Sequence, residues 1–186
     1  MEIEKSKKGI QYVSKIIFII AFVLVFRTFI FGTIGVKGSS MEPTLYHGDV
    51  VAINKLGYLV DAPEFGDIVI CNIDSGNGQE RIIKRVIGLP GDEVELREIK
   101  EQYELEYELY INGEKIEEPY LKEIMQQPGD QSYPLVVPEG AYFVMGDNRN
   151  ASTDSRTKAV GVIPKKDVEG KAFLRIYPLN SFGKLN

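Results

Sequence analysis

Two residues, Ser40 and Lys84, lie in sequence surroundings that suit hydrolytic chemistry. Ser40 belongs to the turn-like segment SSMEPT (39–44), and Lys84 belongs to RIIKRVI (81–87), a run rich in β-branched residues. A serine hydroxyl is a poor nucleophile near neutral pH and needs a base to take its proton, and a serine–lysine pair is a known variant of the histidine-based triad. The two residues therefore predict a serine hydrolase that uses a lysine as its base.

The histidine content of the chain points the same way. His47 is the only histidine, and it follows Ser40 so closely that a catalytic pair between them requires an unusually tight loop. We therefore favour a solvated turn residue over a catalytic role for His47. One histidine and one cysteine also leave little for a transition-metal site, and no glycine-rich phosphate loop followed by Lys-Ser/Thr is present. The sequence thus predicts no metal and no cofactor.

Strand periodicity places Lys84 on an apolar face. Residues two apart in a strand share a face, so Lys84 lies between Ile82 and Val86. A poorly solvated ammonium has a lowered pKa, and the neutral amine can accept a proton. Arg85 has isoleucine neighbours on its own face, but a guanidinium stays protonated and cannot act as a base. On the pattern alone, a structural lysine whose amine extends toward water remains an alternative.

An apolar segment near the amino terminus, residues 10–31, predicts a single membrane anchor. Its uncharged core, 16–26, is shorter than the about 20 residues that span a bilayer, so Lys15 and Arg27 must extend toward opposite interfaces. The lysines before it place residues 1–9 in the cytoplasm and residues 32–186 outside. A cleaved secretory signal ending near 33–35 is the competing interpretation, which we disfavour because the cleavage site is poor.

Composition limits the remaining possibilities. The 186 residues carry a net charge of −5, and five of the 22 basic but only two of the 27 acidic residues fall in the first 32. The rest of the chain, with 17 basic and 25 acidic residues, is acidic, which argues against nucleic-acid binding. Cys71 is the only cysteine, so the single soluble domain must be stable without an internal disulfide.

Beyond the anchor, the sequence predicts β structure. Short apolar runs alternate with Gly, Pro, Asn or Asp, and they cover residues 50–54, 68–73, 82–87, 94–96, 109–111, 115–116, 135–137, 142–145 and 172–177. Asn112-Gly113 is the strongest hairpin signal. We expect one or two helical turns at 120–127 and a solvated, acidic hairpin extension at 98–108.

Five segments in order resemble the type I signal peptidases, which are serine peptidases with a Ser-Lys dyad. They are the end of the anchor, RTFIF (27–31); GSSMEPTL (38–45); GDVV (48–51); KRVIGLPGD (84–92); and GDNRNASTDSR (146–156). The short chain with one anchor is similar to the Gram-positive branch of that family. The resemblance covers most of the chain.

This resemblance implies both a fold and a site. The fold would be mostly β: a single N-terminal transmembrane helix, then an antiparallel, partly barrel-like β catalytic domain with a small inserted β subdomain at about 93–140. Ser40 would be the nucleophile, Lys84 the general base, and Ser152 the hydroxyl that orients the lysine. Supporting residues would be Arg85, Asp147, Asp154 and Arg156.

Two positions depart from the family pattern. Ala151 stands where a second asparagine is common, which should leave the Ser152 hydroxyl in place. Gly38 stands where other branches carry a hydroxyl that binds the oxyanion. Oxyanion stabilisation would then rest on backbone N–H groups at Ser40 and Gly38, and losing one good donor costs about 2.7–4 kcal/mol in the transition state.

The sequence therefore predicts a membrane-anchored serine endopeptidase that cleaves signal peptides from exported precursors on the outer face of the cytoplasmic membrane. Its partners would be those signal peptides and membrane lipid, with no nucleic acid. The alternative is a non-catalytic, membrane-anchored β-domain that binds envelope proteins. The self-cleaving half of some repressors has a related Ser-Lys fold, but such proteins need a soluble amino end. Residues 155–158 fit the Ser-x-x-Lys pattern of penicillin-recognising enzymes without either companion motif.

Overall fold

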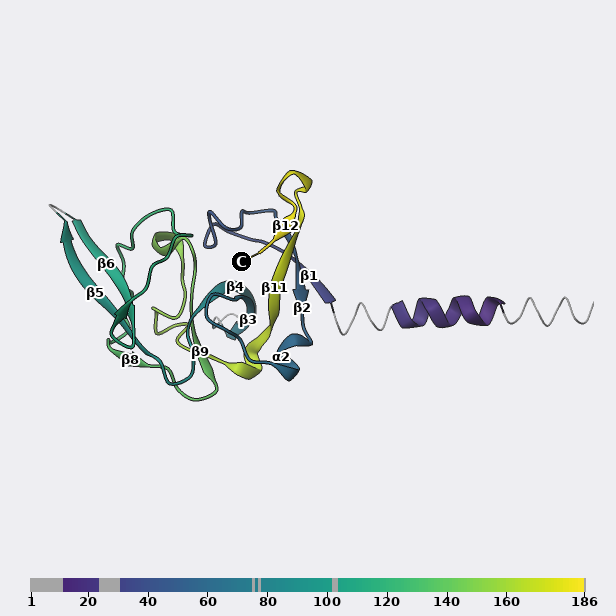
Figure 1. The fold of residues 1–186 in the computed structure, drawn as a ribbon, viewed down its shortest axis with the longest axis horizontal. Helices are drawn as coiled ribbons and strands as arrows, with labels where there is room; N and C mark the ends of the chain where they lie inside the picture. The colour runs from purple at the N-terminus through teal and green to yellow at the C-terminus, as the bar shows by residue number, and fades with distance from the viewer. Residues whose placement is uncertain (1–11, 24–30, 75, 77, 102–103, 186) are drawn as a thin grey trace, which may run out of the picture.

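The computed structural model describes residues 12–23, 31–74, 76, 78–101 and 104–185, and the chain after residue 31 is mostly antiparallel β structure (Figure 1). Residues 12–23 are helical. The later elements are β1 (Phe31–Gly35), β2 (Val50–Asn54), α2 (Gly57–Val60), β3 (Ile68–Asp74), β4 (Gln79–Gly88), β5 (Glu93–Glu101), β6 (Glu104–Ile111), β7 (Glu114–Lys115), β8 (Leu135–Val136), β9 (Ala141–Met145), η1 (Arg149–Ala151), β10 (Ile163–Pro164), η2 (Lys165–Asp167), β11 (Val168–Tyr177), η3 (Leu179–Ser181) and β12 (Gly183–Lys184).

The larger sheet carries the candidate site. Its strand order is β1-β2-β11-β3-β4-β9-β10, with β12 pairing to β11, and each of these described pairs is antiparallel. β4 therefore lies between β3 and β9 near the middle of the sheet, where a side chain has little access to water. Because β1 and β10 end this order, the described strands form an open sheet and not a closed barrel.

A smaller sheet, β7-β6-β5-β8, is built from the chain between β4 and β9. Its β6–β7 turn is the expected two-residue hairpin: Ile111 pairs with Glu114, and Asn112 and Gly113 have φ of 53° and 82°. Positive φ at both central residues is what a type I′ turn requires. Of the acidic stretch at 98–108, the described residues 98–101 and 104–108 lie in the outer part of the β5–β6 hairpin (Figure 1).

Three buried apolar clusters hold these sheets together. The first lies under the Ser40 turn and includes Met41 and Leu45 with side chains of β2 and β3. The second joins the two sheets and contains Val94 of β5 and Phe143 of β9. The third lines the other face of β3 and β4. Because β3 and β4 supply residues to more than one cluster, both of their faces are buried.

Each strand run expected from the sequence overlaps a strand of the structure. The short strands β1, β10 and β12 and the helix α2 were not expected, because each spans at most five residues and lacks a clear alternating pattern. The helical turns expected at 120–127 are wrong: this segment contains turns, bends and one antiparallel bridge from Met125 to Tyr107. Buried Met125 packs in the second cluster, so tertiary contacts override local helix propensity.

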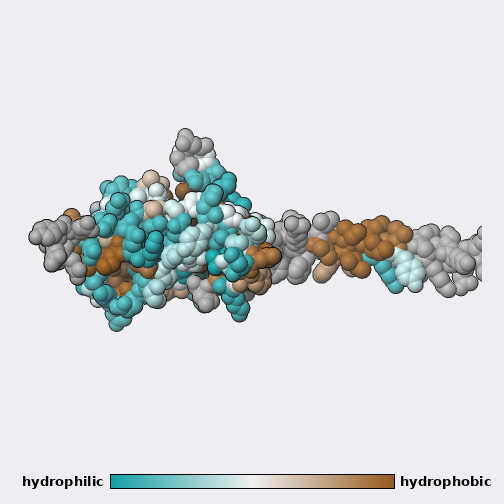
Figure 2. All heavy atoms as spheres, turned by 90° about the horizontal axis from the view of Figure 1, so that it is seen from above, coloured by the Kyte–Doolittle hydropathy of each residue, from teal (hydrophilic) through white to brown (hydrophobic). Residues whose placement is uncertain are grey.

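The expected anchor at 10–31 falls only partly within the described residues. Residues 12–23 are helical and their apolar side chains are exposed (Figure 2), whereas 10–11 and 24–30 lie outside the described part. Among the described residues, no helix is long and apolar enough to span a membrane.

We predict that Gly88→Val lowers the stability of the domain. A Cβ at Gly88 would lie 2.9 Å from Val94 Cγ2, 3.0 Å from Val137 Cγ2 and 3.1 Å from Phe143 Cβ, where the two sheets meet. Overpacking of this kind typically costs about 1–3 kcal/mol. Urea unfolding should therefore give a lower free energy of unfolding than wild type. Gly35→Val is the matched control, because a Cβ there meets no atom within 4 Å; equal losses in both variants would contradict the prediction.

Candidate active site

Ser40 opens a tight turn in the connection between β1 and β2. The turn is closed by the Glu42 N–H, which donates to Ser39 O at 3.1 Å, and by the Leu45 N–H, which donates to Met41 O at 2.8 Å. Met41 and Leu45 are buried in the first cluster and anchor the turn, while Ser40 stays half-buried at the surface of the core. The local sequence thus fixes the backbone and leaves the hydroxyl accessible.

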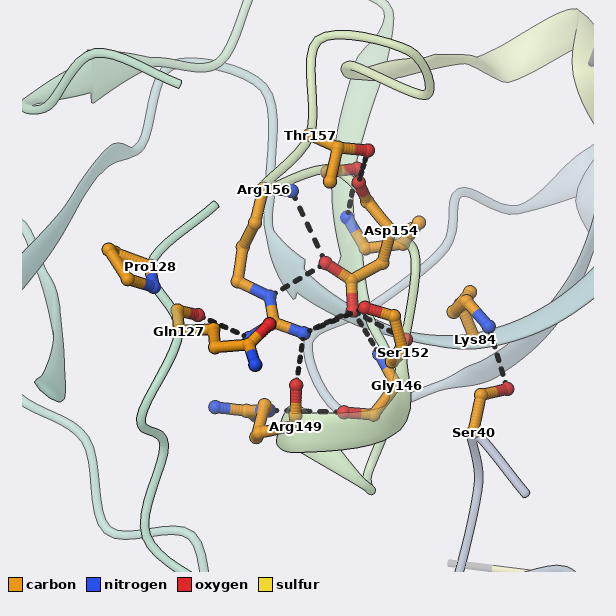
Figure 3. Close-up of polar contacts among 12 residues, drawn as sticks. Ser40, Lys84, Gln127, Pro128, Gly146, Arg149, Ser152, Asp154, Arg156 and Thr157 are labelled. Carbon is orange, nitrogen blue, oxygen red and sulfur yellow. Dashed lines mark hydrogen bonds and ion pairs between the residues drawn. The ribbon is translucent and has the colours of Figure 1, made fainter. Parts of the chain in front are cut away.

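Lys84 reaches Ser40 from β4, 44 residues further along the chain. Its Nζ donates to Ser40 Oγ at 2.8 Å (Figure 3), and the residue is only 4% exposed. The neighbours on its strand face, Ile82 and Val86, both pack in the third cluster, as strand periodicity predicts. The structure therefore brings the two residues singled out in the sequence into direct contact.

Burial lowers the pKa of the Lys84 ammonium below its ordinary value, although the negative charge of Asp154 opposes this shift. Desolvation penalises the charged form of an amine, so the neutral form becomes accessible at lower pH than for a lysine in water. A neutral amine 2.8 Å from a hydroxyl oxygen is placed to receive its proton. The geometry and the shift thus agree with the use of Lys84 as a base.

Asp154 organises the loop after β9. Its carboxylate accepts hydrogen bonds from the Ser152 hydroxyl at 2.6 Å, from the Gly146 N–H at 3.0 Å and from Arg156 Nε at 2.8 Å (Figure 3). Burial pushes the pKa of Asp154 upward, but the hydrogen bond and charge of Arg156 outweigh it, and the pKa lies below the ordinary value. Asp154 is therefore a buried carboxylate.

Arg85 and Asp147 form a second, separate buried pair. Arg85 Nε and Nη2 donate to the two Asp147 oxygens at 2.8 and 2.7 Å, and Arg85 Nη1 donates to Gly66 O. The Thr44 hydroxyl, from the Ser40 turn, also donates to Asp147 at 2.5 Å. The four expected supporting residues are thus close to the site as two bidentate pairs, which satisfies charges that are costly to bury alone.

Gly146 lies against the backbone of Ser40. A Cβ at this position would collide with the Ser40 carbonyl oxygen and with the Ser152 hydroxyl, so a side chain here cannot be accommodated without movement. Two residues later, the Asn148 N–H donates to Ser40 O at 3.0 Å. The loop therefore contacts the backbone of Ser40 directly.

The backbone donors expected for an oxyanion differ in their environment. The Gly38 N–H already donates to Nδ1 of the exposed His47 at 3.2 Å, so His47 closes the loop around the Ser40 turn. Within the described part of the chain, no acceptor is bonded to the Ser40 N–H. Of these two donors, the Ser40 N–H is thus the one without an acceptor among the described residues, and His47 has a structural contact of its own.

Two residues near the site were not anticipated from the sequence. Arg149 and Glu118 form a bidentate ion pair whose side chains are 1% and 7% exposed. They lie 31 positions apart, and nothing in the local pattern separates Glu118 from the many other acidic residues. In the described part of the chain, no group of three or more His, Cys, Asp or Glu side chains is arranged to hold a metal.

The chain is similar in sequence to proteins of one family. The family described as "Signal peptidase, peptidase S26" matches residues 9–177. Signal peptidase I S of Bacillus subtilis (strain 168) is 37% identical over 99% of this chain and 97% of its own length. Signal peptidase I of Bacillus licheniformis is 39% identical over 97% and 95%, and signal peptidase IB of Staphylococcus aureus is 36% identical over 88% and 87%.

A solved structure of a signal peptidase I from Enterococcus faecalis V583 is 33% identical and aligns with 60% of this chain and 97% of that chain, with a TM-score of 0.42. The family match and the relatives span nearly the whole chain, including every residue of the site described above. The chain therefore belongs to the signal peptidase I family, peptidase S26.

Proposed function

We propose that this chain is a membrane-anchored serine endopeptidase that cleaves N-terminal signal peptides from exported precursor proteins, with Ser40 as nucleophile and Lys84 as general base. Its membership of the signal peptidase I family makes it a peptidase, and the names of its relatives point to signal peptides as substrates. The observation that carries the residue assignment is the 2.8 Å contact between the buried Lys84 Nζ and Ser40 Oγ.

The proposed reaction follows from this contact. Neutral Lys84 takes the hydroxyl proton as Ser40 Oγ attacks the scissile carbonyl carbon, which forms a tetrahedral oxyanion. The resulting ammonium then gives its proton to the leaving amine as the carbon–nitrogen bond breaks, leaving an acyl-enzyme. Water then attacks the ester carbonyl carbon while Lys84 takes its proton. As the bond between this carbon and Ser40 Oγ breaks, Lys84 returns the proton to Ser40 Oγ and the peptide leaves with a new carboxyl end. In this scheme the Ser40 N–H is the main backbone donor to the oxyanion.

Ser152 fits the proposed role of orienting the lysine. Its hydroxyl proton is directed to Asp154 Oδ2, at 2.6 Å, so its lone pairs remain able to accept a hydrogen bond from the Lys84 amine. Asp154, held by Arg156, would keep the Ser152 hydroxyl in this orientation. The Arg85–Asp147 pair would support the site differently, by joining β4 to Thr44 in the Ser40 turn.

The proposed location is the cytoplasmic membrane, crossed once by residues 10–31, with the amino end in the cytoplasm and the catalytic domain on the outer face. The exposed apolar side chains of 12–23, such as Ile16, Phe18 and Phe22 at 56%, 71% and 59%, support contact with lipid (Figure 2). β1 begins at Phe31, the last residue of the proposed anchor, so the anchor leads directly into the sheet that carries the site. The substrate groove would therefore lie near the membrane surface.

We predict that Lys84→Arg abolishes cleavage of a precursor that carries a signal peptide. Arginine keeps the positive charge and much of the bulk, but its guanidinium cannot accept the Ser40 proton. Purified full-length protein in detergent should be mixed with the precursor, and product formation followed on a gel. Retained cleavage by the Lys84→Arg variant would refute the assignment of the base. A wild-type protein that is folded yet inactive would favour the non-catalytic binding domain instead.

The pH dependence provides a second test. Because Lys84 must be neutral to act and burial lowers its pKa, kcat/KM should rise with pH through that lowered pKa. The midpoint should lie below the ordinary lysine value of about 10.4. Initial rates measured across the pH range in which the protein stays folded would show this acid limb. A rate that does not depend on pH would place the base elsewhere.

A third prediction concerns the proposed anchor. Deleting residues 1–30 leaves β1 intact, so the remaining domain should cleave a short soluble peptide at a rate comparable to that of the full chain. The same domain should process membrane-inserted precursors poorly, because it is no longer held near the bilayer. Both rates should be measured with equal enzyme concentrations, using proteoliposomes for the inserted substrate. Equal processing of inserted precursor by both forms would show that the anchor does not deliver the substrate.

A further inference from the structure

We propose that Glu118 and Arg149 are positioning residues whose buried ion pair ties the inserted subdomain to the loop that holds the backbone of Ser40. This inference rests on the proposed function, because it assigns the pair a role in the reaction of Ser40. It also gives the segment between β7 and β8, residues 116–134, here called the returning segment, a part in catalysis.

The ion pair is specific in its geometry. Arg149 Nη1 donates to Glu118 Oε2 at 2.7 Å, and Arg149 Nη2 donates to Glu118 Oε1, so the two groups meet in a bidentate arrangement. Burial lowers the pKa of Arg149, but the hydrogen bond and charge of Glu118 outweigh it and the pKa lies above the ordinary value. Arg149 therefore keeps its charge, and the bidentate contact orients the Arg149 and Glu118 side chains on each other.

From Arg149 the contacts lead to the nucleophile in two steps. Arg149 Nε donates to Gly146 O at 3.1 Å, which holds the turn between β9 and η1 (Figure 3). Within this turn, the Asn148 N–H donates to Ser40 O at 3.0 Å, and Gly146 packs against the same carbonyl. A displacement of Arg149 would thus move the groups that touch the Ser40 backbone.

The returning segment makes further hydrogen bonds to the same loop. Asn150 accepts from the Gln126 N–H at 2.8 Å and donates to Ile124 O at 3.0 Å. Arg156 Nη1 donates to Gln127 O at 2.8 Å (Figure 3). These contacts fix the segment beside the loop, and the ion pair is the contact nearest to Gly146 in sequence. The subdomain is therefore attached through the catalytic loop as well as through the second apolar cluster.

Tyr120 extends the contact to β4. Its ring lies under the Arg85 guanidinium, 4.1 Å from the Arg85 Cζ atom, and its hydroxyl donates to Glu118 Oε1 at 2.6 Å. Arg85 in turn holds Asp147, the residue after Gly146. One carboxylate, that of Glu118, is thus linked to both sides of the turn that contacts Ser40.

A buried ion pair adds little to the net stability of a fold, but it fixes the positions of the two side chains. Moving two charges out of water largely offsets their attraction, and well-packed apolar residues often match or exceed the stability of such a pair. A bidentate pair fixes both distance and orientation, which apolar contacts do not. This difference separates a positioning role from a structural one in an experiment.

The first test is Glu118→Gln in the full-length protein, assayed with a signal-peptide precursor well below the unfolding temperature of the variant. Loss of the carboxylate should release Arg149 and misplace Ser40, so kcat should fall about 10- to 100-fold while KM changes little. Glu117→Gln is the matched control, since Glu117 is the exposed neighbour, and it should retain wild-type kcat. An unchanged kcat in Glu118→Gln, or a change in KM alone, would overturn the proposal.

The double variant Glu118→Met/Arg149→Met separates positioning from stability. It removes both charges without leaving one buried alone, so its Tm should be close to that of the wild type. Its kcat should nevertheless stay low, because no guanidinium holds Gly146 O. Recovery of wild-type kcat in the double variant would show that the single variant suffered only from destabilisation, and the proposal would fail.

Ser40→Ala, assayed in parallel, tests the proposed function separately. Loss of all cleavage in Ser40→Ala supports the nucleophile that the inference requires. Cleavage that persists in Ser40→Ala overturns the proposed function and the inference together, whereas a dead Ser40→Ala with a fully active Glu118→Gln overturns the inference alone.

Discussion

The site depends on one unfavourable interaction, the burial of the Lys84 amine on the apolar face of a central strand. In water this amine would be protonated near neutral pH; β3, β4 and the third cluster exclude solvent from it and lower its pKa, which is what the proposed role as a base requires. The buried position of Lys84 also restricts where Ser40 can lie. Ser40 must arrive from a different segment at hydrogen-bond distance, and it does so at the start of a turn whose own side chains are fixed in the core. The depth of β4 in the sheet is thus a chemical requirement as well as a packing result.

Among the described residues, the buried charges around Ser40 and Lys84 form two ion pairs. Arg85 pairs with Asp147, and Arg156 pairs with Asp154. Of the nearby charges, that of Asp154 has the largest effect on the pKa of Lys84, which it raises without a direct contact. Each pair also joins segments that are far apart in sequence. Arg85 of β4 is joined through Asp147 to Thr44, and Arg156 donates to the carbonyl of Gln127. Because each guanidinium has several donors in fixed directions, one arginine orders two or three pieces of backbone. This explains why irregular loops, rather than strands, form much of the wall around Ser40.

The features that could be predicted from the sequence are those with a local signal. Alternating apolar runs located the main strands, Asn112-Gly113 located a hairpin, and the chemical difference between lysine and arginine separated Lys84 from Arg85. The pairing of the four supporting charges was only partly visible in the sequence: Arg156 lies two residues from Asp154, but the partner of Asp147 is Arg85, 62 residues away on β4. Glu118 was missed for the same reason. Its role depends on a partner brought close by the whole insertion, and a sequence rich in glutamate gives no indication of which one is buried. The hydrogen bond from the Gly38 N–H to His47 was likewise not predicted, because the sequence does not show whether a histidine in a turn faces water or accepts a hydrogen bond.

The position of the insertion between β4 and β9 has a consequence for how such chains can diverge. β4 and β9 are hydrogen-bonded neighbours, so the chain leaves and re-enters the larger sheet at nearly the same place. Lengthening or shortening the β5–β6 hairpin therefore costs the larger sheet little, because loop-closure entropy grows slowly with length. The returning segment has no such freedom, since its register is set by Arg149, Asn150 and Arg156. Evolutionary change in length should accordingly concentrate at the outer end of the hairpin, while residues 118–131 keep a constant spacing.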